Sequence, residues 1–272
     1  SVLEMRRVTW RNLFAHKLRL ILSAFAIVLG IAFLSGSLVF TDTLGRSFDQ
    51  LAYGTVTDVT VRPATEAGDA VSMNINRDAR SIPAEYVEKV ADLAEVKQAQ
   101  GAISGTGLFV VKKDNRLLGG TGAPTIGLNA GVGEPIPNAA GEKMTNWLEG
   151  TEPTKEGEIA LDQRSADNAG YAVGETVKLA MPGDPPIVKA KLVGTFEFAS
   201  GGLAGATLVV FDDKSAQKYF FGSQDVFSTI AVQGEPGVSQ TELATAVSKV
   251  IPAGTEAITG EKLGEESKDL FD

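Results

Sequence analysis

The stretch LRLILSAFAIVLGIAFLSGSLVF, residues 18–40, determines how the rest of the sequence can be interpreted. Residues 20–40 contain no charged side chain, and a helix of that length would span about 30 Å, the thickness of a bilayer's hydrocarbon core. A core helix of a soluble domain would carry polar side chains at every third or fourth position, whereas this segment has only serine hydroxyls. We therefore predict a transmembrane helix over residues 20–41. A cleaved signal sequence ending near Ser35-Gly36-Ser37 is the alternative, although its apolar segment would be shorter.

The basic residues on either side of this segment predict its orientation. Residues 41–60 contain a single basic residue, Arg46. The preceding segment contains five, namely Arg6, Arg7, Arg11, Lys17 and Arg19. Because basic flanking segments stay in the cytoplasm, the N-terminus is expected on the cytoplasmic side of the cell membrane. Residues after about 41 are then expected to be extracytoplasmic.

Residues 1–19 are expected to form a basic amphipathic helix at the cytoplasmic interface. One face of this helix would carry Leu3, Trp10, Leu13 and Phe14, and the other Arg7, Arg11 and Lys17. A helix of this kind lies in the headgroup layer with its apolar face towards the acyl chains. An unstructured basic leader is the alternative.

Two pairs of small residues, Ala26/Gly30 and Ala32/Gly36, recur at a spacing of four within the apolar segment. Such spacing allows a second helix to approach closely inside a membrane, where burial of apolar surface cannot drive helix association. These four residues are therefore predicted to pack against another span.

The remainder of the sequence is acidic and free of cysteine. Residues 20–272 contain 20 basic and 33 acidic residues, a net charge of −13. An acidic exterior argues against binding to nucleic acid or to an anionic membrane surface. Without cysteine, an extracytoplasmic domain has to be stabilised by packing instead of disulfides.

Hydrophobic periodicity predicts an α+β fold, in which a mixed α/β unit is interrupted by a β-rich insertion. The α/β parts are expected at about 42–115 and 212–272, and the insertion at about 116–211. Expected helices cover 82–96, 213–222, 239–250 and 261–271, and expected strands include 55–63, 158–162, 176–181 and 188–198.

Three local features make these predictions specific. In the strand 188–198, even-numbered residues are expected to be buried, while Thr195 and the lysines face solvent. Asp212 or Asp213 is expected to cap the helix that Gly222 ends. Ser239 and Glu242 match a capping box.

The sequence offers no catalytic motif. Its only histidine, His16, lies in the basic leader, so His-based triads and metal sites are not expected in the outer domain. The glycine-rich stretches lack the order of a phosphate-binding loop. Two acidic doublets, Asp212-Asp213 and Glu265-Glu266, are interpreted as a helix cap and a solvated helix face. We therefore expect neither enzymatic activity nor a cofactor or metal.

The order of these segments resembles the N-terminal portion of FtsX/MacB-type ABC transporter permeases. The resemblance is carried by WRNLFAHKLRLILSAFAIVLGIAF (10–33), SGSLVFTDTLGRSFDQL (35–51), LEGTEPTKEGEIALDQRSADNAGYAVGETVKLAMP (148–182), KLVGTFEF (191–198) and LVVFDDKSAQKYF (208–220). Each motif is loose, but their order and spacing cover nearly the whole chain.

This resemblance implies a first transmembrane helix followed by a MacB-like periplasmic core domain, with a porter-like α/β part and a sabre-like insertion. Three further spans would follow residue 272. Partners would be a separate cytoplasmic ABC ATPase, a second permease half or copy and the lipid membrane. The outer domain would export or extract a lipophilic or peptide substrate, or transmit force across the membrane. Two other interpretations are open: a single-pass anchored binding or sensor module, and a secreted enzyme with a cleaved leader.

Overall fold

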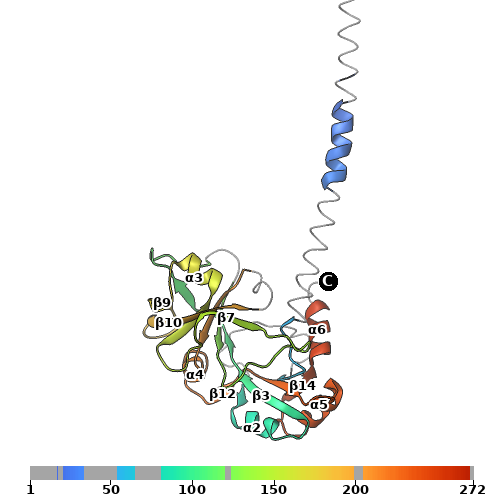
Figure 1. Ribbon diagram of the computed structural model, residues 1–272, viewed down its shortest axis with the longest axis vertical. Coiled ribbons are helices and arrows are strands. Elements are labelled where there is room, and N and C mark those ends of the chain that lie inside the picture. Colours follow the sequence, from blue (N-terminus) through green and yellow to red (C-terminus); the bar gives the residue numbers. More distant parts are fainter. Residues whose placement is uncertain are drawn as a thin grey trace, which may run out of the picture. The chain divides into compact units, whose positions relative to one another are not determined.

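The computed structural model describes Lys17 and residues 21–33, 54–64, 81–119, 124–198 and 205–269. The chain divides into two units, Ser1–Phe48 and Asp49–Asp272. In the first unit, residues 21–33 form a helix (Figure 1). The side chains of this helix are all exposed. Among the described residues, no helix is both long and apolar enough to cross a membrane. Both ends of the predicted span 20–41 lie outside the described helix.

The second unit contains a four-stranded antiparallel sheet with the order β14-β1-β13-β3. Its strands are β1 (Val59–Pro63), β3 (Val96–Ala102), β13 (Thr229–Gly234) and β14 (Thr255–Thr259). Helices α2 (Glu85–Ala91) and α5 (Gln240–Ser248) pack against one face of it. The shared core contains Val59, Val61, Val90, Ile230, Val232, Leu243 and Val247. The last helix, α6 (Gly260–Asp269), follows β14.

This unit also contains a larger sheet of eight strands. Its order is β4-β6-β11-β8-β10-β9-β5, and β7 pairs with the second half of β10. Its strands are β4 (Ser104–Gly105), β5 (Phe109–Val111), β6 (Thr125–Asn129), β7 (Thr145–Gly150), β8 (Glu158–Asp162), β9 (Thr176–Ala180), β10 (Ile187–Phe198) and β11 (Thr207–Phe211).

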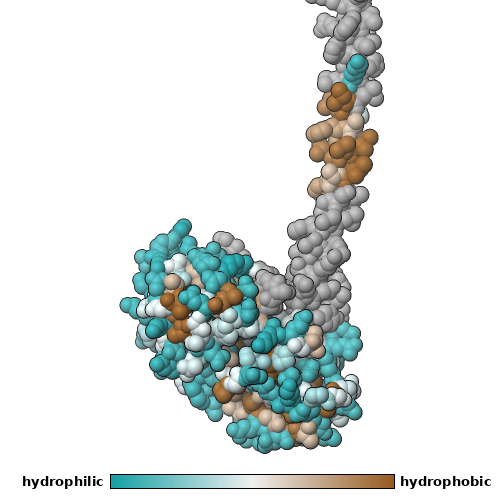
Figure 2. Space-filling model, in the orientation of Figure 1, coloured by the Kyte–Doolittle hydropathy of each residue, from teal (hydrophilic) through white to brown (hydrophobic). Residues whose placement is uncertain are grey.

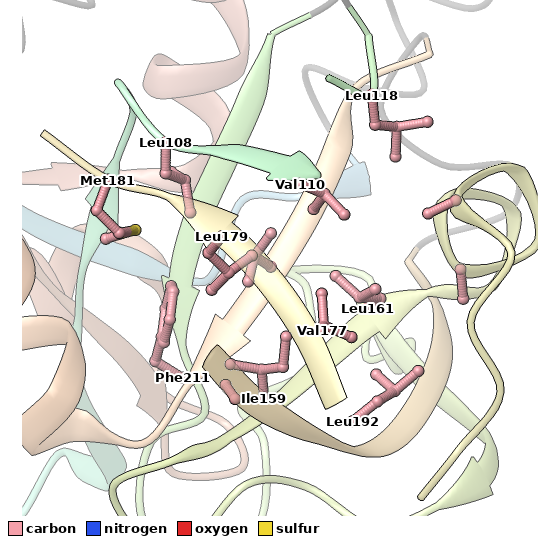
Figure 3. Close-up of a cluster of buried hydrophobic side chains, with 14 of the residues drawn as sticks. Leu108, Val110, Leu118, Ile159, Leu161, Val177, Leu179, Met181, Leu192 and Phe211 are labelled. Carbon is pink, nitrogen blue, oxygen red and sulfur yellow. The ribbon is translucent and has the colours of Figure 1, made fainter. Parts of the chain in front are cut away.

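Both faces of the eight-stranded sheet bury apolar side chains. On one face, Leu161, Leu179, Leu192 and Phe211 meet in the cluster drawn in Figure 3, together with residues of α3 (Gln163–Ala169) and α4 (Asp213–Phe221). On the other face, Phe196 belongs to a smaller cluster with Ala160, Ala206, Leu208 and Val210. A separate pair of short strands, β2 (Ile82–Pro83) and β12 (Val226–Phe227), completes the unit.

The chain changes from one sheet to the other earlier than the sequence predicted. β3 ends at Ala102 in the four-stranded sheet, and β4 already belongs to the eight-stranded sheet at Ser104. The predicted boundary at about 116 therefore falls after β5. Only the pairing of a strand decides to which sheet it belongs, and its own sequence does not reveal its partner.

Three predicted elements differ in detail. The strand expected over 55–63 begins at Val59. The helix expected over 82–96 is confined to 85–91, because Ile82–Pro83 pairs with β12 and Val96 begins β3. In β10, Thr195 was expected to face solvent but is only 2% exposed. The register shifts twice around it, once on each neighbouring strand, and such irregularities change which face a side chain occupies.

The predicted helix ends of α4 and α5 are confirmed. The carboxylate of Asp212 accepts a hydrogen bond from the Ser215 N–H, and Gly222 ends α4 in the left-handed conformation at φ 60°. In α5, the Ser239 hydroxyl accepts from the Glu242 N–H while the Glu242 carboxylate accepts from the Ser239 N–H. Both caps satisfy N–H groups that have no partner within the helix itself.

Candidate functional site

A cavity of about 390 Å³, here called the cleft, lies between the two sheets. One wall is the face of the four-stranded sheet that is opposite its helices. Because successive residues of a strand point to opposite faces, Val59 and Val61 pack under the helices while Thr60 faces the cleft. Gln100 and Ala231 of neighbouring strands line the same wall, which is small and polar.

The other wall of the cleft is aromatic and aliphatic. Phe196 and Phe198 of β10, Leu128 of β6 and Val210 of β11 contribute to it. Trp147 of β7 packs edge-to-face on Phe196, with ring centroids 5.4 Å apart and an angle of 62° between the planes. Arrangements of this kind are favoured by the charge distribution of aromatic rings. The two walls therefore give the cleft one polar and one apolar side.

The segment 130–144, which joins β6 to β7, closes one side of the cleft. It leaves the eight-stranded sheet and attaches to the chain just before β1, where the Ala139 N–H donates to the Val56 carbonyl at 2.7 Å. The Gln100 amide of β3 donates to the Val132 carbonyl at 3.0 Å and to the Glu134 carbonyl at 2.7 Å. This segment thus fixes part of the distance between the two sheets.

A second connection between the sheets is centred on Asn129, at the end of β6. Its amide oxygen accepts from the Ile103 N–H at 2.7 Å, and its amide nitrogen donates to the Gly101 carbonyl of β3 at 2.9 Å. The same nitrogen donates to the Asp213 carboxylate at 2.8 Å, which also accepts from the Gly131 N–H at 3.0 Å. Asn129 therefore joins both sheets and the start of α4 at the cleft.

Among the residues that the structure describes, Glu152 is the only ionisable one that lines the cleft. Within the described part of the chain, no group of three or more His, Cys, Asp and Glu side chains is placed to hold a metal ion. The cleft therefore offers apolar contact, a few hydrogen-bonding groups and a single carboxylate, a lining typical of sites for small lipophilic ligands.

The structure assigns structural roles to the acidic doublets. Asp212 caps α4, as predicted, while Asp213 binds the Asn129 amide. In the second doublet Glu265 is exposed, as expected for a solvated helix face, and the Glu266 side chain is 43% exposed while its carboxylate accepts from the Arg62 guanidinium at 2.8 Å. Burial lowers the pKa of Arg62, yet its bonds to Glu256 and Glu266 outweigh this and leave the pKa raised.

The predicted span-packing and interface residues fall only partly within the described chain. Ala26, Gly30 and Ala32 lie on the helix 21–33 and are exposed, and a side chain at Gly30 would meet no atom within 4 Å. Lys17 is also exposed. Outside the described residues lie Gly36, Arg6, Arg7, Trp10, Arg11 and Arg19. Their predicted roles remain predictions.

Sequence reasoning did not identify the cleft, because its walls come from strands that are distant in the sequence. One signal was present, since the alternation of β10 places Phe196 and Phe198 on the same face. Trp147 had no such signal, because β7 is short and mostly exposed.

Comparison with known proteins identifies the family. The sequence model of the MacB-like periplasmic core domain matches residues 20–250. The crystal structure of the periplasmic region of MacB from Actinobacillus actinomycetemcomitans superposes with a TM-score of 0.52 at 13% identity, covering 79% of this chain and 94% of that one. No curated protein sequence matches the chain significantly.

Two further solved structures have TM-scores just under 0.5. The extracellular domain of the noncanonic ABC-type transporter YknZ from Gram-positive bacteria gives 0.48 at 12% identity, covering 75% of this chain and 99% of that one. A domain of a putative permease protein from Porphyromonas gingivalis gives 0.47 at 14% identity, covering 76% and 89%.

The described fold is thus a mixed α/β extracytoplasmic domain like the periplasmic region of MacB. The chain belongs to the MacB-like periplasmic core domain family, and its resemblance to FtsX/MacB-type permeases is confirmed. Membership of this family supports a general role as part of an ABC transporter permease.

Proposed function

We propose that this chain forms the first span and the outer domain of a permease subunit whose movements are driven by a separate cytoplasmic ABC ATPase. The observation that carries the proposal is the family match over residues 20–250, which begins in the apolar segment and includes the eight-stranded sheet and three strands of the four-stranded sheet. The chain itself would have no catalytic role, and a second permease half or copy would complete the transporter.

The apolar helix supports membrane anchoring. Every described side chain from Ile21 to Phe33 is exposed, including Phe25 and Leu29, and Figure 2 shows this helix as mostly hydrophobic surface. Exposed apolar surface of this extent requires a cover of lipid or other helices. With the basic leader on the cytoplasmic side, the outer domain would be placed beyond the membrane.

The cleft would be the part of the outer domain that responds to ATP hydrolysis. Its walls belong to different sheets, so a small movement of one sheet against the other changes its volume. An apolar wall and one carboxylate suit a lipophilic or peptide substrate. Alternatively, the same movement of the sheets would transmit force to an extracellular partner instead of moving a substrate.

Purification of the full-length protein from membranes tests the assembly. A co-purifying ATP-binding subunit is expected under conditions that preserve complexes. Its consistent absence would contradict the proposal and favour a single-pass anchored binding or sensor module. The matched control is a variant in which Arg6, Arg7, Arg11, Lys17 and Arg19 are all replaced by Gln, which should reduce or invert membrane insertion.

Topology is tested separately with a reporter enzyme fused after Asp272. Reporter activity is expected on the extracytoplasmic side only, and the fusion protein should remain in the membrane fraction. Activity in the cytosol, or release of the outer domain as free protein, would contradict both the span and the permease role.

Movement of the cleft can be followed because the chain contains no cysteine. An environment-sensitive dye on Ala231→Cys should change its fluorescence when ATP is added to the assembled complex. The same dye on Thr245→Cys, on the exposed face of α5, should not respond. Equal responses at both positions would argue against a specific role of the cleft.

A further inference from the structure

A second hollow, of about 750 Å³, lies beside the first half of β10. We call it the edge slot. It shares no lining residue with the cleft. Its lining includes Glu156, Ile187, Lys189, Lys218, Tyr219 and Phe221.

The edge slot borders a strand edge with free backbone groups. The Lys191 N–H donates to the Gly157 carbonyl at 2.7 Å, on the side of β10 where β8 lies. Because backbone groups of successive residues point to alternate sides, those of Ile187 and Lys189 point in the same direction as those of Lys191. β8 pairs with β10 only from Lys191 onward. Within the described part of the chain, no backbone hydrogen bond reaches Ile187 or Lys189 from that side.

The opposite side of the edge slot is formed by α4. Tyr219 and Phe221 are half-buried and provide aromatic surface, and burial raises the pKa of the Tyr219 hydroxyl, which keeps it neutral. At the rim, the Lys218 ammonium pairs with the Glu156 carboxylate at 2.5 Å. A strand placed in the slot would therefore meet hydrogen-bonding groups on one side and apolar rings on the other.

The charges along β10 specify what such a strand would carry. Lys189 lies directly opposite Lys178 of β9, and like charges in this position destabilise a sheet. Neither lysine forms an ion pair with any described residue, and Lys178 only donates to the Asn115 side chain at 3.4 Å. Two residues later, Lys191 is beside Glu158 of β8. An acidic residue of an added strand, placed next to Lys189, would repeat this pairing of a lysine of β10 with an acidic neighbour.

We propose that the edge slot binds an extended segment of a partner protein outside the cytoplasm, which adds a short strand to β10. An acidic side chain of that segment lies beside Lys189, and its apolar side chains face Tyr219 and Phe221. Main-chain hydrogen bonds to Ile187 and Lys189 supply affinity, and the alternating side chains supply specificity. The inference goes beyond the proposed transport role and does not depend on the cleft.

A different protein fits the slot better than a second copy of this chain. Pairing two copies through the same edge would bring their Lys189 side chains together, each already opposite a Lys178. Ile187, which lines the slot, is 46% exposed, and Phe109, two strands away on β5, is 38% exposed. In Figure 2, hydrophobic surface is visible over β9 and β10. A partner strand would cover part of it.

Peptide binding to the full chain in phosphatidylcholine nanodiscs tests the proposal. The probe is the hexapeptide acetyl-VTIEIT-amide, in which apolar and polar residues alternate around one glutamate. Residue-resolved hydrogen exchange should show a fast Lys189 amide without peptide, slowed at least tenfold when the peptide is saturating. The Val188 amide, which already bonds to β9, should change little.

Charge exchange provides the matched control. A fluorescent acetyl-VTIKIT-amide should bind about fivefold more weakly than the glutamate peptide, since one favourable cross-strand pair becomes a repulsive one. Lys189→Glu should reverse this preference. Lys97→Glu, an exposed position on β3 outside the slot, should leave it unchanged.

Equal binding of the two peptides, no protection of Lys189, or protection at the cleft would overturn the proposal. Protection of Lys189 that depends on the chain's own concentration would also overturn it, since the occupant would then be a second copy. A photoreactive side chain at position 187 in the full-length protein in cells should cross-link to another protein, and cross-linking only to lipid would count against it. These results are independent of whether an ATPase co-purifies.

Discussion

The two sheets of the outer domain differ in how many of their faces are buried. In the four-stranded sheet, Val59 and Val61 are fully buried, while Thr60 between them lines the cleft. In the eight-stranded sheet, all five residues of β11 are buried. One sheet has a single covered face, and the other has apolar clusters on both faces.

This difference explains the composition of the cleft. The polar face of the small sheet and the second apolar face of the large sheet meet there. Two sheets with one apolar face each would have closed on one another as a common core or separated as two domains. The cavity is partly polar because only the wall from the eight-stranded sheet is apolar and gains stability from being removed from water.

The largest effect is expected from the core of the eight-stranded sheet. Phe211 is 1% exposed and packs edge-to-face on Tyr219 and Phe220. Phe211→Ala should lower the free energy of unfolding by about 3–5 kcal/mol, because it leaves a large cavity. Urea denaturation measures this. Phe109→Ala, at an exposed position of the same sheet, should cost about 1 kcal/mol, and equal costs would contradict the burial of Phe211 in this core.

A somewhat smaller effect is expected where β7 meets β10. At Gly150 a Cβ would lie 2.0 Å from the Val193 carbonyl oxygen, and φ is +70°. Gly150→Ala should therefore cost about 3 kcal/mol, through backbone displacement as well as the left-handed conformation. Gly141→Ala has a similar φ of +82° but open space around it, and should cost only about 1 kcal/mol. A difference of zero would show that β7 is not held in this position.

Asn129→Ala tests the connection between the sheets. It leaves the Ile103 N–H and the Gly101 carbonyl without their partner, which should cost about 2 kcal/mol. It should also change the fluorescence of Trp147 in a Trp10→Phe background, where Trp147 is the only tryptophan of this sequence. Asn115→Ala, at an exposed turn, is the control. An unchanged Trp147 spectrum would indicate that the cleft does not depend on Asn129.

The smallest effect concerns the start of α5, in the four-stranded sheet's helical layer. Ser239→Ala removes the cap and should cost about 1 kcal/mol at pH 7. Ser248→Ala, whose hydroxyl only donates to the Ala244 carbonyl of the same helix, should cost less. Thermal unfolding of both variants measures the difference, and equal losses would contradict the capping role.

The same helix start should also be sensitive to acid. Hydrogen bonds from the Ser239 N–H and hydroxyl lower the pKa of Glu242. Because this pKa is lower in the folded state, the carboxylate contributes stability above its ordinary pKa of 4.5 and loses it as the pH falls through the folded pKa. Glu242→Gln should remove this part of the acid dependence. An unchanged pH profile would show that the box is not formed in solution.

The elements whose signals are local could be predicted closely. The caps of α4 and α5 and the strand β8 follow from short sequences in which capping chemistry and periodicity agree. The burial of Thr195 could not be predicted, because it results from irregular pairing with two other strands. The change from one sheet to the other after β3 could not be predicted either, because only strand pairing decides it.

The sequence by itself determined an apolar segment with a basic flank, an acidic cysteine-free outer region and the order of elements that identifies the family. These properties depend on residues close together in the chain. The cleft, the Asn129 connection and the edge slot were decided only by the tertiary structure, because each is built from strands or helices that are distant in the sequence. Strand pairing is a long-range choice, and the side chains that make these sites carry no local signal of their neighbours.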